Sequence, residues 1–599
     1  MCGINGFNWE DKDLIKKMNE RIKHRGPDDE GVYIDKEISL GNRRLAIIDL
    51  SSAAKQPMSN EDNTIWMTYN GEIYNFKEIR KDLEKKGHKF ISDSDTEVII
   101  HGYEEYGLDI LKKLNGMFAF AIYNSNKKKL FLVRDRFGIK PLYYYFDGKK
   151  FIFSSEIKGV LVHDIKRTPN NNVIFDYLVF NLTDHSEETF FENVYRVMPG
   201  TYLEFNLKTR KIIKKKWYSL ENKNAGMDAQ KIRDYFFKSI NYRLISDVPV
   251  GSCLSGGIDS SSIVCVIKNI SPNSKIKTFS AVFPGKNIDE TKYISEVIKR
   301  TNVISFLTTP TPTMLFQDLN DVIKTQEEPF LGTSIYAQYS VMKLAHKNNM
   351  KVLLDGQGGD EIFAGYPSYI NPYFLELFMN FKWRFLVSQF KWYFRTYRNM
   401  SPIFFILSRP GRFFLKNKSK PFWIKKSFFQ SYSSSKKFKD SLSQRLIQDL
   451  TYSTIPSYLR YEDKNAMRWS IETRLPFLDH EFVEKTIFLP AEYKIRNGIT
   501  KYIFRKAIKD ILPEKIRLRT DKIGFATPMD AWLKSELFIE LTDNLIDSKA
   551  FKERIYWDWK KVKKEFEKYK NNEKNISLDV WKWINLELWL RMFIDKTIV

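Results

Sequence analysis

A short apolar run that passes into a glycine- and serine-rich turn constrains the fold of this chain more than any other stretch. Residues 248–254 (VPVGSCL) are predicted to form a buried strand, residues 255–261 (SGGIDSS) a turn, and residues 263–267 part of a helix. Glycines let a backbone approach a ligand closely, and free N–H groups at a helix N-terminus point at an anion. The turn lacks the Gly-Lys-Ser/Thr ending of the ordinary phosphate loop. The stretch therefore predicts an anion site of another kind.

The segments that follow this turn alternate between strands and helices. Strands are predicted at residues 276–283, 303–307 and 351–355, with helical segments between them. Such alternation predicts a parallel α/β sheet whose ligands lie at the carboxyl ends of the strands. Residues 355–361 (DGQGGDE) follow one of these strands. We expect them to approach the same ligand from across the crevice.

The first 205 residues show a different pattern, typical of stacked, mostly antiparallel sheets. A helix is predicted at residues 14–22, and residues 32–49 alternate like strands with Gly41-Asn42 as a turn signal. Residues 65–69 are predicted to form a strand that Asn70-Gly71 interrupts. Further short strands are predicted at residues 117–123, 130–135, 142–146 and 151–155. Helices packed on such sheets make an α+β domain.

The chain is too long, at 599 residues, for a single core. We predict a first domain at residues 1–205, a linker at 206–228 marked by the polar stretch 222–226, and a second domain at 229–599. The 43% apolar and 28% charged residues are typical of a soluble globular protein. No signal peptide or membrane span is predicted, and three cysteines are too few for a disulfide scaffold. We expect a reducing cytoplasm.

Cys2 becomes the first residue if the initiator methionine is removed. It would then carry both a thiol and a free α-amine, which makes a nucleophile with its own base attached. By itself, a cysteine after the initiator can also be a chance occurrence.

Six strings in the first 200 residues resemble, in order, those of class II glutamine amidotransferase domains. They are Cys2-Gly3-Ile4, residues 24–28 (HRGPD), 70–75 (NGEIYN), 94–97 (SDTE), 116–121 (GMFAFA) and 134–138 (RDRFG). The resemblance implies an N-terminal-nucleophile (Ntn) hydrolase fold, a sandwich of two sheets between helical layers (αββα).

The same resemblance implies roles for individual residues. The Cys2 thiolate would attack the glutamine amide carbonyl, while the Asn70 side chain and the Gly71 N–H would stabilise the oxyanion. A tight Asn-Gly turn can leave such donors outside the strand ladder, although most Asn-Gly pairs are ordinary hairpin turns.

Three charged residues complete the implied glutamine site. Arg44 would pair with the α-carboxylate as a bidentate fork, and Glu72 and Asp95 would hold the α-ammonium. Arg44 could instead be a surface charge, although Arg43 is the one of the pair that we expect at the surface.

The turn at 255–261 resembles the pyrophosphate loop of enzymes that cleave ATP to AMP and pyrophosphate. This implies Mg²⁺ bound by Asp259 and Asp360. The alternative is a plain Gly-Ser turn. The implied ATP-binding residues are Leu254, Ser255, Gly256, Gly257, Asp259, Ser260, Asp355 and Gly356.

The two halves together resemble the glutamine-hydrolysing asparagine synthetases, with further matches at residues 470–479 (SIETRLPFLD) and 498–501 (GITK). The second half would then be a synthetase domain with a helical C-terminal part, taking glutamine, aspartate and ATP, in a chain that could pair as a homodimer. Glutamine would be hydrolysed, aspartate adenylated with release of pyrophosphate, and ammonia would cross an internal passage and displace AMP. Lys501 would stabilise the charge that develops during adenylation, unless it is an ordinary surface lysine.

One residue departs from this pattern. Members of the family carry a glutamate, interpreted as the base for the attacking ammonia, where this chain has Gln357. A neutral amide cannot accept a proton at pH 7. Either another group such as Glu361 serves, or positioning suffices. A different carboxylate acceptor, on a sugar or peptide intermediate, therefore stays open, as does a non-catalytic scaffold.

Much of the net charge of +24 is concentrated in one segment. Residues 371–440 hold 15 Lys or Arg against Glu376 and Asp440, interleaved with aromatic residues, and match the family poorly. A helical insertion that packs on the second domain is one interpretation, and a surface for anionic lipid or a polyanionic acceptor is another. Stacking on single-stranded nucleic acid rests on composition alone, and no specific nucleic acid is expected.

Overall fold

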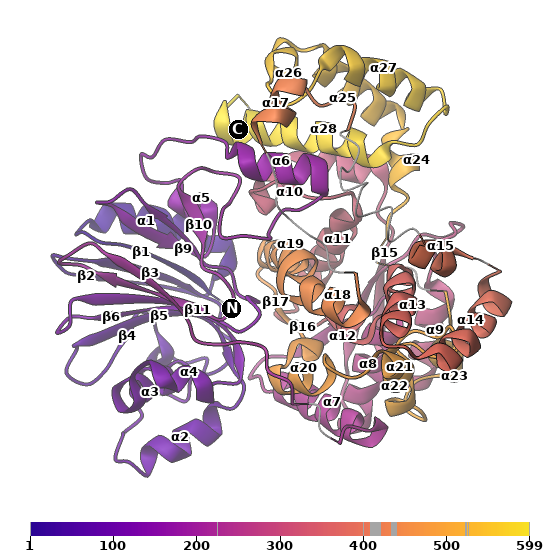
Figure 1. Ribbon diagram of the computed structural model, residues 1–599. Coiled ribbons are helices and arrows are strands. Elements are labelled where there is room, and N and C mark those ends of the chain that lie inside the picture. The colour runs from indigo at the N-terminus through magenta and orange to yellow at the C-terminus, as the bar shows by residue number, and fades with distance from the viewer. Residues whose placement is uncertain are drawn as a thin grey trace.

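The computed structural model describes residues 2–223, 226–398, 400–407, 421–432, 440–521, 524 and 526–597. Met1, part of the predicted linker (224–225) and parts of the basic insertion and of the loop at 522–528 lie outside these residues. Figure 1 shows an N-terminal sandwich beside a larger domain, with a layer of C-terminal helices above the latter.

Two antiparallel sheets form the N-terminal domain in the described part of the chain. They stack face to face over a core that includes Ile4, Leu40, Tyr123 and Leu132. The first sheet runs β10 (Val194–Arg196), β8 (Tyr143–Phe146), β9 (Phe151–Ser154), β1 (Gly3–Phe7), β3 (Ser39–Arg44), β2 (Asp29–Ile34). The second runs β12 (Ile212–Lys216), β11 (Thr201–Asn206), β7 (Lys129–Arg134), β6 (Gly116–Asn124), β5 (Ile65–Ile73), β4 (Met58–Ser59).

Helices cover the outer face of each sheet. α1 (Lys12–Arg21) and α5 (Ile157–Val160) lie on the first sheet, while α2 (Phe76–Glu84), α3 (Glu97–Tyr106) and α4 (Ile110–Lys113) lie on the second (Figure 1). α1 begins at Asp11, whose side chain accepts a hydrogen bond from the Leu14 N–H, and it buries Ile15 and Met18. The predicted αββα sandwich is therefore confirmed.

The turn predicted at Gly41-Asn42 and the strand interruption predicted at Asn70-Gly71 are both wrong. Asn42 pairs within β3, and Asn70-Gly71 lies inside β5, opposite Ala119 and Phe118 of β6. The glycine at 71 serves close packing rather than a turn, because a Cβ there would lie 2.2 Å from the Met117 carbonyl oxygen. The dipeptide Asn-Gly is the same whether its glycine forms a turn or allows close packing inside a strand. The sequence alone therefore does not distinguish the two structures.

The N-terminal domain extends beyond residue 206, where the predicted linker begins. β12 pairs with β11, so this part of residues 206–228 belongs to the second sheet. The next domain begins with α7 (Ala229–Arg243), whose N-cap residue Asp228 accepts a hydrogen bond from the Lys231 N–H at 2.8 Å.

A parallel sheet forms the centre of the second domain, as predicted. Its order is β15 (Ile304–Thr308), β14 (Lys277–Ala281), β13 (Val250–Cys253), β16 (Val352–Leu354) and β17 (Glu472–Arg474). β13 and β16 are neighbours, which brings the turn at 255–261 and the string at 355–361 to one edge. β17 was not predicted, because its sequence Glu-Thr-Arg has no apolar pattern.

Helices surround this sheet and continue to the C-terminal region. Those near the sheet include α8 (Ile258–Ile270), α9 (Thr291–Thr301), α10 (Pro312–Gln326), α11 (Ser334–Lys347), α12 (Gly359–Phe363), α18 (Leu442–Gln448), α19 (Ile455–Met467), α20 (His480–Thr486) and α22 (Tyr502–Ala507). The insertion contributes α13 (Ile370–Met379), α14 (Trp383–Tyr397), α15 (Ser401–Leu407) and α17 (Lys426–Ser431), and the last layer α24 (Met529–Leu533), α25 (Glu536–Asp547), α26 (Lys549–Glu553), α27 (Trp559–Lys570) and α28 (Ser577–Trp589). No described helix is both long and apolar enough to span a bilayer.

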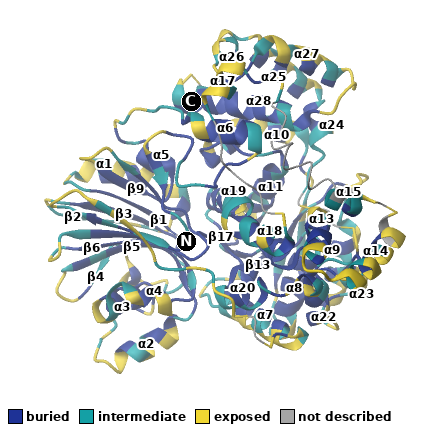
Figure 2. Ribbon diagram, viewed as in Figure 1, coloured by how far each residue is buried: buried dark blue, intermediate teal, exposed yellow. Residues whose placement is uncertain are grey.

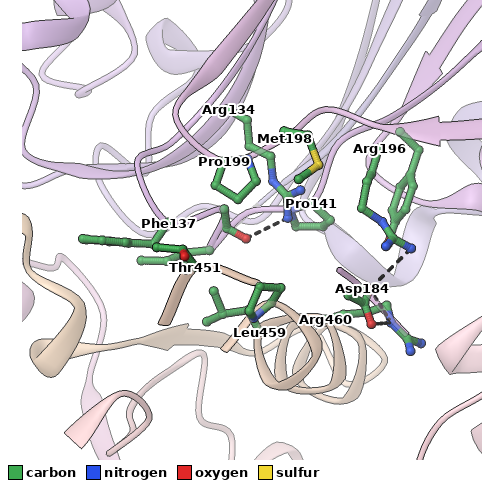
Figure 3. Close-up of a pocket in the computed structure, with 14 residues that line it drawn as sticks. Arg134, Phe137, Pro141, Asp184, Arg196, Met198, Pro199, Thr451, Leu459 and Arg460 are labelled. Atoms are coloured by element: carbon green, nitrogen blue, oxygen red, sulfur yellow. Dashed lines mark hydrogen bonds and ion pairs between the residues drawn. The ribbon is translucent and has the colours of Figure 1, made fainter. Parts of the chain in front are cut away.

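The two domains meet across buried charges. α6 (Asn171–Phe180) of the N-terminal half lies beside α28 (Figure 1), and the Lys582 ammonium donates to the Leu178 carbonyl at 2.9 Å. Figure 3 shows a small cavity beside which Arg460 of α19 meets Asp184, at 2.9 Å. Buried ion pairs of this kind fix the position of one domain relative to the other, because moving the domains apart would leave unpaired charges in an apolar environment.

Candidate functional site

Cys2 lies buried directly before β1, with its backbone held on both sides. Its N–H donates to the Asn70 Oδ1 at 3.0 Å, and its carbonyl accepts from the Arg25 Nε at 3.1 Å. Burial raises the pKa of the Cys2 thiol, while a hydrogen bond with the Leu45 backbone and the charge of Arg44 act in the opposite direction. A buried thiol needs a neighbouring base to become a thiolate at neutral pH.

Asn70 presents a buried amide donor to this site. Its Oδ1 is occupied by the Cys2 N–H, whereas its Nδ2 has no hydrogen-bond partner among the described residues. An unpaired buried N–H group costs about 1–3 kcal/mol. A group that is left unpaired next to a thiol is suited to receive a negatively charged oxygen during a reaction.

The Gly71 N–H is a second such donor. In an antiparallel ladder, opposed residues alternate between hydrogen-bonded and non-hydrogen-bonded pairs. Phe118, opposite Gly71, directs both its N–H and its carbonyl to Asp135 on the other side. The Gly71 N–H therefore points to the open edge of β5, where no hydrogen bond from it is found in the described part of the chain.

The neighbouring N–H groups on this edge are occupied. The Tyr69 N–H donates to the Gln56 Oε1 at 2.7 Å, and the Ile73 N–H donates to the Asp95 Oδ2 at 2.8 Å. The Gly71 N–H is thus free because it lies on an unpaired edge of β5. The predicted turn is not the reason.

Two buried carboxyl groups, those of Asp95 and Glu72, lie at β5. Asp95 accepts from the Tyr69 hydroxyl at 2.7 Å as well as from the Ile73 N–H, and burial raises its pKa to about 6. Burial and the nearby Glu472 raise the pKa of Glu72 well above its ordinary value, although the Arg474 guanidinium lies 3.4 Å from Glu72. A cationic ligand would stabilise both carboxylates.

Arg44 lies at the end of β3 and is buried. Its guanidinium donates to the carbonyls of Ser51 at 3.0 Å and Ile48 at 3.4 Å, and also contacts the Asp49 carbonyl. It therefore holds the loop after β3 as well as lying close to Cys2. Arg43 is not at the surface as expected: it is 5% exposed and pairs with Glu30 at 2.7 Å.

Sequence reasoning missed several buried charged residues at this site, and the synthetase half contributes most of them. Arg25 is fully buried, donating to Asp463 of α19 at 2.7 and 3.1 Å and to Glu156 at 2.9 Å. Glu472 and Arg474 of β17 pair at 2.6 Å beside Glu72. Arg25 and Arg474 both lie in strings that match the family, and this was the only signal of their importance.

Replacing Arg25 by methionine is expected to destabilise the folded chain by about 3–5 kcal/mol, because it leaves Asp463 buried without its cation. Chemical denaturation followed by tryptophan fluorescence measures the change. Arg21→Met, at an exposed position on α1, is the control and should change stability by no more than about 0.5 kcal/mol. Equal midpoints for the two variants would contradict the interpretation.

A cavity of about 440 Å³ opens where β13 and β16 end. Seven of the eight predicted ATP-binding residues line it: Leu254, Ser255, Gly257, Asp259, Ser260, Asp355 and Gly356. Gly256 does not line it; its backbone φ of +78° shapes the turn, and its carbonyl accepts from Arg519 at 2.9 Å. The volume lies within the range of small-molecule sites.

The N-terminus of α8 opens onto this cavity. No side chain caps the helix, and the Ser255 and Ser260 hydroxyls hydrogen-bond each other at 3.0 Å across the turn. The first N–H groups of a helix attract anions. The arrangement can therefore bind a phosphate group.

Lys501 lies between the two carboxylates that were predicted to bind magnesium. Its Nζ is 2.5 Å from the Asp259 Oδ1 and 2.6 Å from the Asp360 Oδ1. The Lys501 backbone is in the left-handed region (φ 54°), and a Cβ at Gly365 would lie 2.3 Å from the Lys501 Cε. Two hard oxygen donors that converge on one cation fit Mg²⁺ as well.

Gln357 also lines the cavity, together with Tyr366 and Tyr458. Glu361 does not line it; the residue is 1% exposed and lies behind Tyr366, whose hydroxyl donates to the Glu361 Oε1 at 3.0 Å. Burial and the charge of Asp360 raise the pKa of Glu361 to about 8. Among the described residues, the Tyr366 hydroxyl is the contact that links this carboxyl group to the cavity.

The N-terminal domain contributes Asn181, at the end of α6, to the wall of this cavity. Neither its position in the chain nor a motif pointed to it. The cavity is therefore not a property of the second domain alone.

Comparisons with known proteins match both halves of the chain to families. A glutamine amidotransferase domain family matches residues 1–218, and the asparagine synthase family matches residues 231–591. Asparagine synthetase [glutamine-hydrolyzing] 1 of Bacillus subtilis is 33% identical over 100% of this chain and 97% of its own length. A putative asparagine synthetase [glutamine-hydrolyzing] 2 of Methanocaldococcus jannaschii is 39% identical over 62% of this chain and 77% of its own.

Two weaker similarities complete the comparison. Amidase chry2 of Gibberella zeae is 25% identical over 96% of both chains. A solved glutamine phosphoribosylpyrophosphate amidotransferase from B. subtilis is 15% identical over 59% of this chain and 81% of that chain, with a TM-score of 0.28, which is too low to inform the fold. The family matches, which span both halves, show that this chain belongs to the glutamine-hydrolysing asparagine synthetases, a family of ATP-dependent ligases.

Proposed function

We propose that Cys2 is the nucleophile that hydrolyses glutamine, once Met1 has been removed. The nitrogen that contacts the Asn70 Oδ1 would then be the α-amine, oriented to take the thiol proton and pass it to the leaving ammonia. The developing oxyanion would be received by the Asn70 Nδ2 and the Gly71 N–H. The proposal is supported by the unpartnered Asn70 Nδ2 and by the Gly71 N–H that faces the open edge of β5, in a site where Asn70 also holds the Cys2 backbone.

We propose that the same site recognises glutamine through its charged end. Arg44 would pair with the α-carboxylate, and Asp95 and Glu72 would pair with the α-ammonium. Because burial disfavours the charged form of both carboxyl groups, the ligand's ammonium would supply positive charge in addition to that of Arg474.

The raised pKa of Asp95 gives this part of the proposal a pH dependence. Asp95 takes up a proton as the pH falls below about 6, and the neutral acid no longer attracts the α-ammonium. We expect kcat/KM for glutamine to fall below about pH 6, mainly through KM, while ammonia-dependent synthesis does not show this step. In Asp95→Asn the step should disappear and KM stay high at all pH values; an unchanged profile in that variant would exclude Asp95 as its source.

We propose that the cavity at the strand ends binds ATP and the acceptor carboxylate. The α8 N-terminus would hold the pyrophosphate portion, and Asp259 and Asp360 would bind Mg²⁺, which would neutralise phosphate charge when present. Lys501, released from the two carboxylates, would stabilise charge on the α-phosphate as the acceptor oxygen attacks. The convergence of three charged groups at the mouth of the phosphate turn supports this assignment.

Aspartate is the acceptor that we propose, since the relatives over the full chain are named asparagine synthetases. The test is glutamine-dependent pyrophosphate release with a panel of carboxylic acids. Asparagine and pyrophosphate are expected in equal amounts with aspartate. Turnover with another acid but none with aspartate would favour the alternative acceptor, which Gln357 keeps open; similarity to a protein named as an amidase is compatible with such variation.

The missing glutamate at position 357 has a candidate substitute in the Tyr366–Glu361 pair. We propose that the attacking ammonia loses its proton through the Tyr366 hydroxyl, the only contact between Glu361 and the cavity found among the described residues. Tyr366→Phe is expected to slow ammonia-dependent synthesis by about 10²-fold in kcat. Restoring a glutamate with Gln357→Glu in that background should recover much of the rate; no recovery, or full activity of Tyr366→Phe, would show that positioning suffices.

The homodimer stays a prediction. Light scattering of the purified chain would test it directly.

A further inference from the structure

The basic insertion presents a mixed aromatic and basic face that the proposed reaction does not use. We define the α14 surface as Phe381, Trp383, Arg384, Val387, Lys391, Phe394 and Arg395. Its large apolar side chains are unusually exposed: 76% for Phe381, 45% for Trp383, 54% for Val387 and 43% for Phe394. Large apolar side chains that gather in one exposed patch mark an interaction site more often than scattered ones do.

Helical geometry sorts these residues into stripes. With 3.6 residues per turn, Leu386, Gln389 and Tyr393 share the face that packs against the protein. Trp383, Val387 and Phe394 share the next face, turned away from the core but still apolar. Arg384, Lys391 and Arg395 share the face beyond it, so an aromatic stripe and a basic stripe run side by side.

Packing from beneath holds the helix in place. Tyr393 contacts the ring of Phe374 of α13 with centroids 5.6 Å apart, and the Gln389 side chain donates to Asn497 at 3.1 Å. At the start of the helix, Trp383 contacts Phe378 edge-on at 4.8 Å. The outward side chains therefore project from a fixed helix rather than from a loose one.

The charge on this surface is uncompensated. The sequence has no acidic residue between Glu376 and Asp440. Arg384, Lys391 and Arg395 make no ion pair in the described part of the chain, although exposed lysines and arginines elsewhere in the molecule commonly have one. An anionic partner would supply the missing counter-charge.

The α14 surface lies far from the glutaminase half. Figure 1 places α14 at the outer edge of the second domain, and Figure 2 shows it exposed along much of its length. α13, which joins the cavity residue Tyr366 to α14, spans about 15 Å. Occupation of the surface would thus leave the site around Cys2 uncovered.

We propose that the α14 surface docks this enzyme onto an anionic lipid bilayer. Trp383 and Phe394 would enter the interface between headgroups and acyl chains, where aromatic side chains are favoured, and the adjacent basic stripe would contact lipid phosphates. Segregated aromatic and basic stripes match the layers of a membrane surface. Binding of single-stranded nucleic acid would favour aromatic side chains within a basic groove instead. The inference is independent of which acceptor the enzyme uses.

Flotation of the full chain with lipid vesicles tests this proposal. We expect binding to vesicles of equal parts phosphatidylglycerol and phosphatidylcholine at low salt, much weaker binding at high salt, and none to pure phosphatidylcholine. Trp383→Ser/Phe394→Ser and, separately, Arg384→Glu/Lys391→Glu should each lower the partition coefficient about tenfold or more. Ammonia-dependent synthesis should be unchanged in both variants, which shows that they are folded.

The matched control is Lys560→Glu/Lys564→Glu on α27, two exposed lysines at another place on the surface. It changes the net charge by the same amount as the α14 reversal and is expected to keep wild-type binding. Equal loss in this control would show that net charge alone drives binding and would overturn the proposal. So would failure of the wild-type chain to float, or loss with the charge reversal but not with the aromatic variant, which would indicate a polyanion site.

Discussion

Cys2→Ala is expected to abolish glutamine-dependent synthesis while leaving ammonia-dependent synthesis intact. The substitution removes the only nucleophile beside the Asn70 Nδ2 and the Gly71 N–H in the described part of the chain, and loss of a nucleophile typically lowers the rate by about 10⁴-fold or more. The cavity that we propose to bind ATP lies at the strand ends of the second domain, and Cys2 is not among its lining residues. Asparagine formation is measured with glutamine and, in parallel, with an ammonium salt.

Cys265→Ala is the matched control, because Cys265 is another buried free thiol but lies within α8. It should retain glutamine use. Loss of both activities in Cys2→Ala would argue against two separable reactions, and glutamine-dependent turnover in that variant would assign the nucleophile elsewhere.

Lys501→Met is expected to give the opposite pattern. Without the ammonium, charge that develops on the phosphate and carboxyl oxygens loses a preorganised partner, which typically costs about 10²–10³-fold in kcat. Asp259 and Asp360 would also repel each other across the space that the ammonium fills. Pyrophosphate release should therefore fall with either nitrogen source, while hydrolysis of glutamine to glutamate continues.

Lys506→Met controls for the loss of one positive charge on the same helix, since Lys506 is exposed. It should leave both activities within about twofold of wild type, as expected for a surface substitution. If Lys501→Met stopped glutamine hydrolysis as well, its effect would have to be on the fold or on coupling between the sites rather than on adenylation.

Local patterns in the sequence predicted those parts of the structure that depend on local chemistry. The turn at 255–261 could be placed because strand, glycines and helix start are contiguous, and the structure puts seven of the eight predicted residues on the cavity wall. Asn70-Gly71 led to the expected pair of donors for a wrong reason, since a strand edge, not a turn, leaves Gly71 unpaired.

Contacts between distant residues could not be predicted in this way. Arg25 and Asp463 are 438 residues apart. In the sequence each is an ordinary charged residue, and only the fold brings them into contact. β17 is three residues long and polar, so only its neighbour β16 makes it a strand. Arg43 was assigned to the surface, but the pairing of β2 with β3 places Glu30 beside it and buries the arginine side chain, while Glu30 itself stays exposed.

The contact of Arg25 with both the Cys2 carbonyl and Asp463 has a consequence for modularity. A glutaminase half that is cut off at the domain boundary would keep Arg25 beside Cys2, the proposed nucleophile, but without Asp463, one of the two carboxylates that pair with this arginine. A chimera that fuses this half to another synthetase would therefore also need α19 and β17 of this chain. A linker joins the two units in sequence, but the buried contacts of Arg25 make each unit depend on the other in the fold.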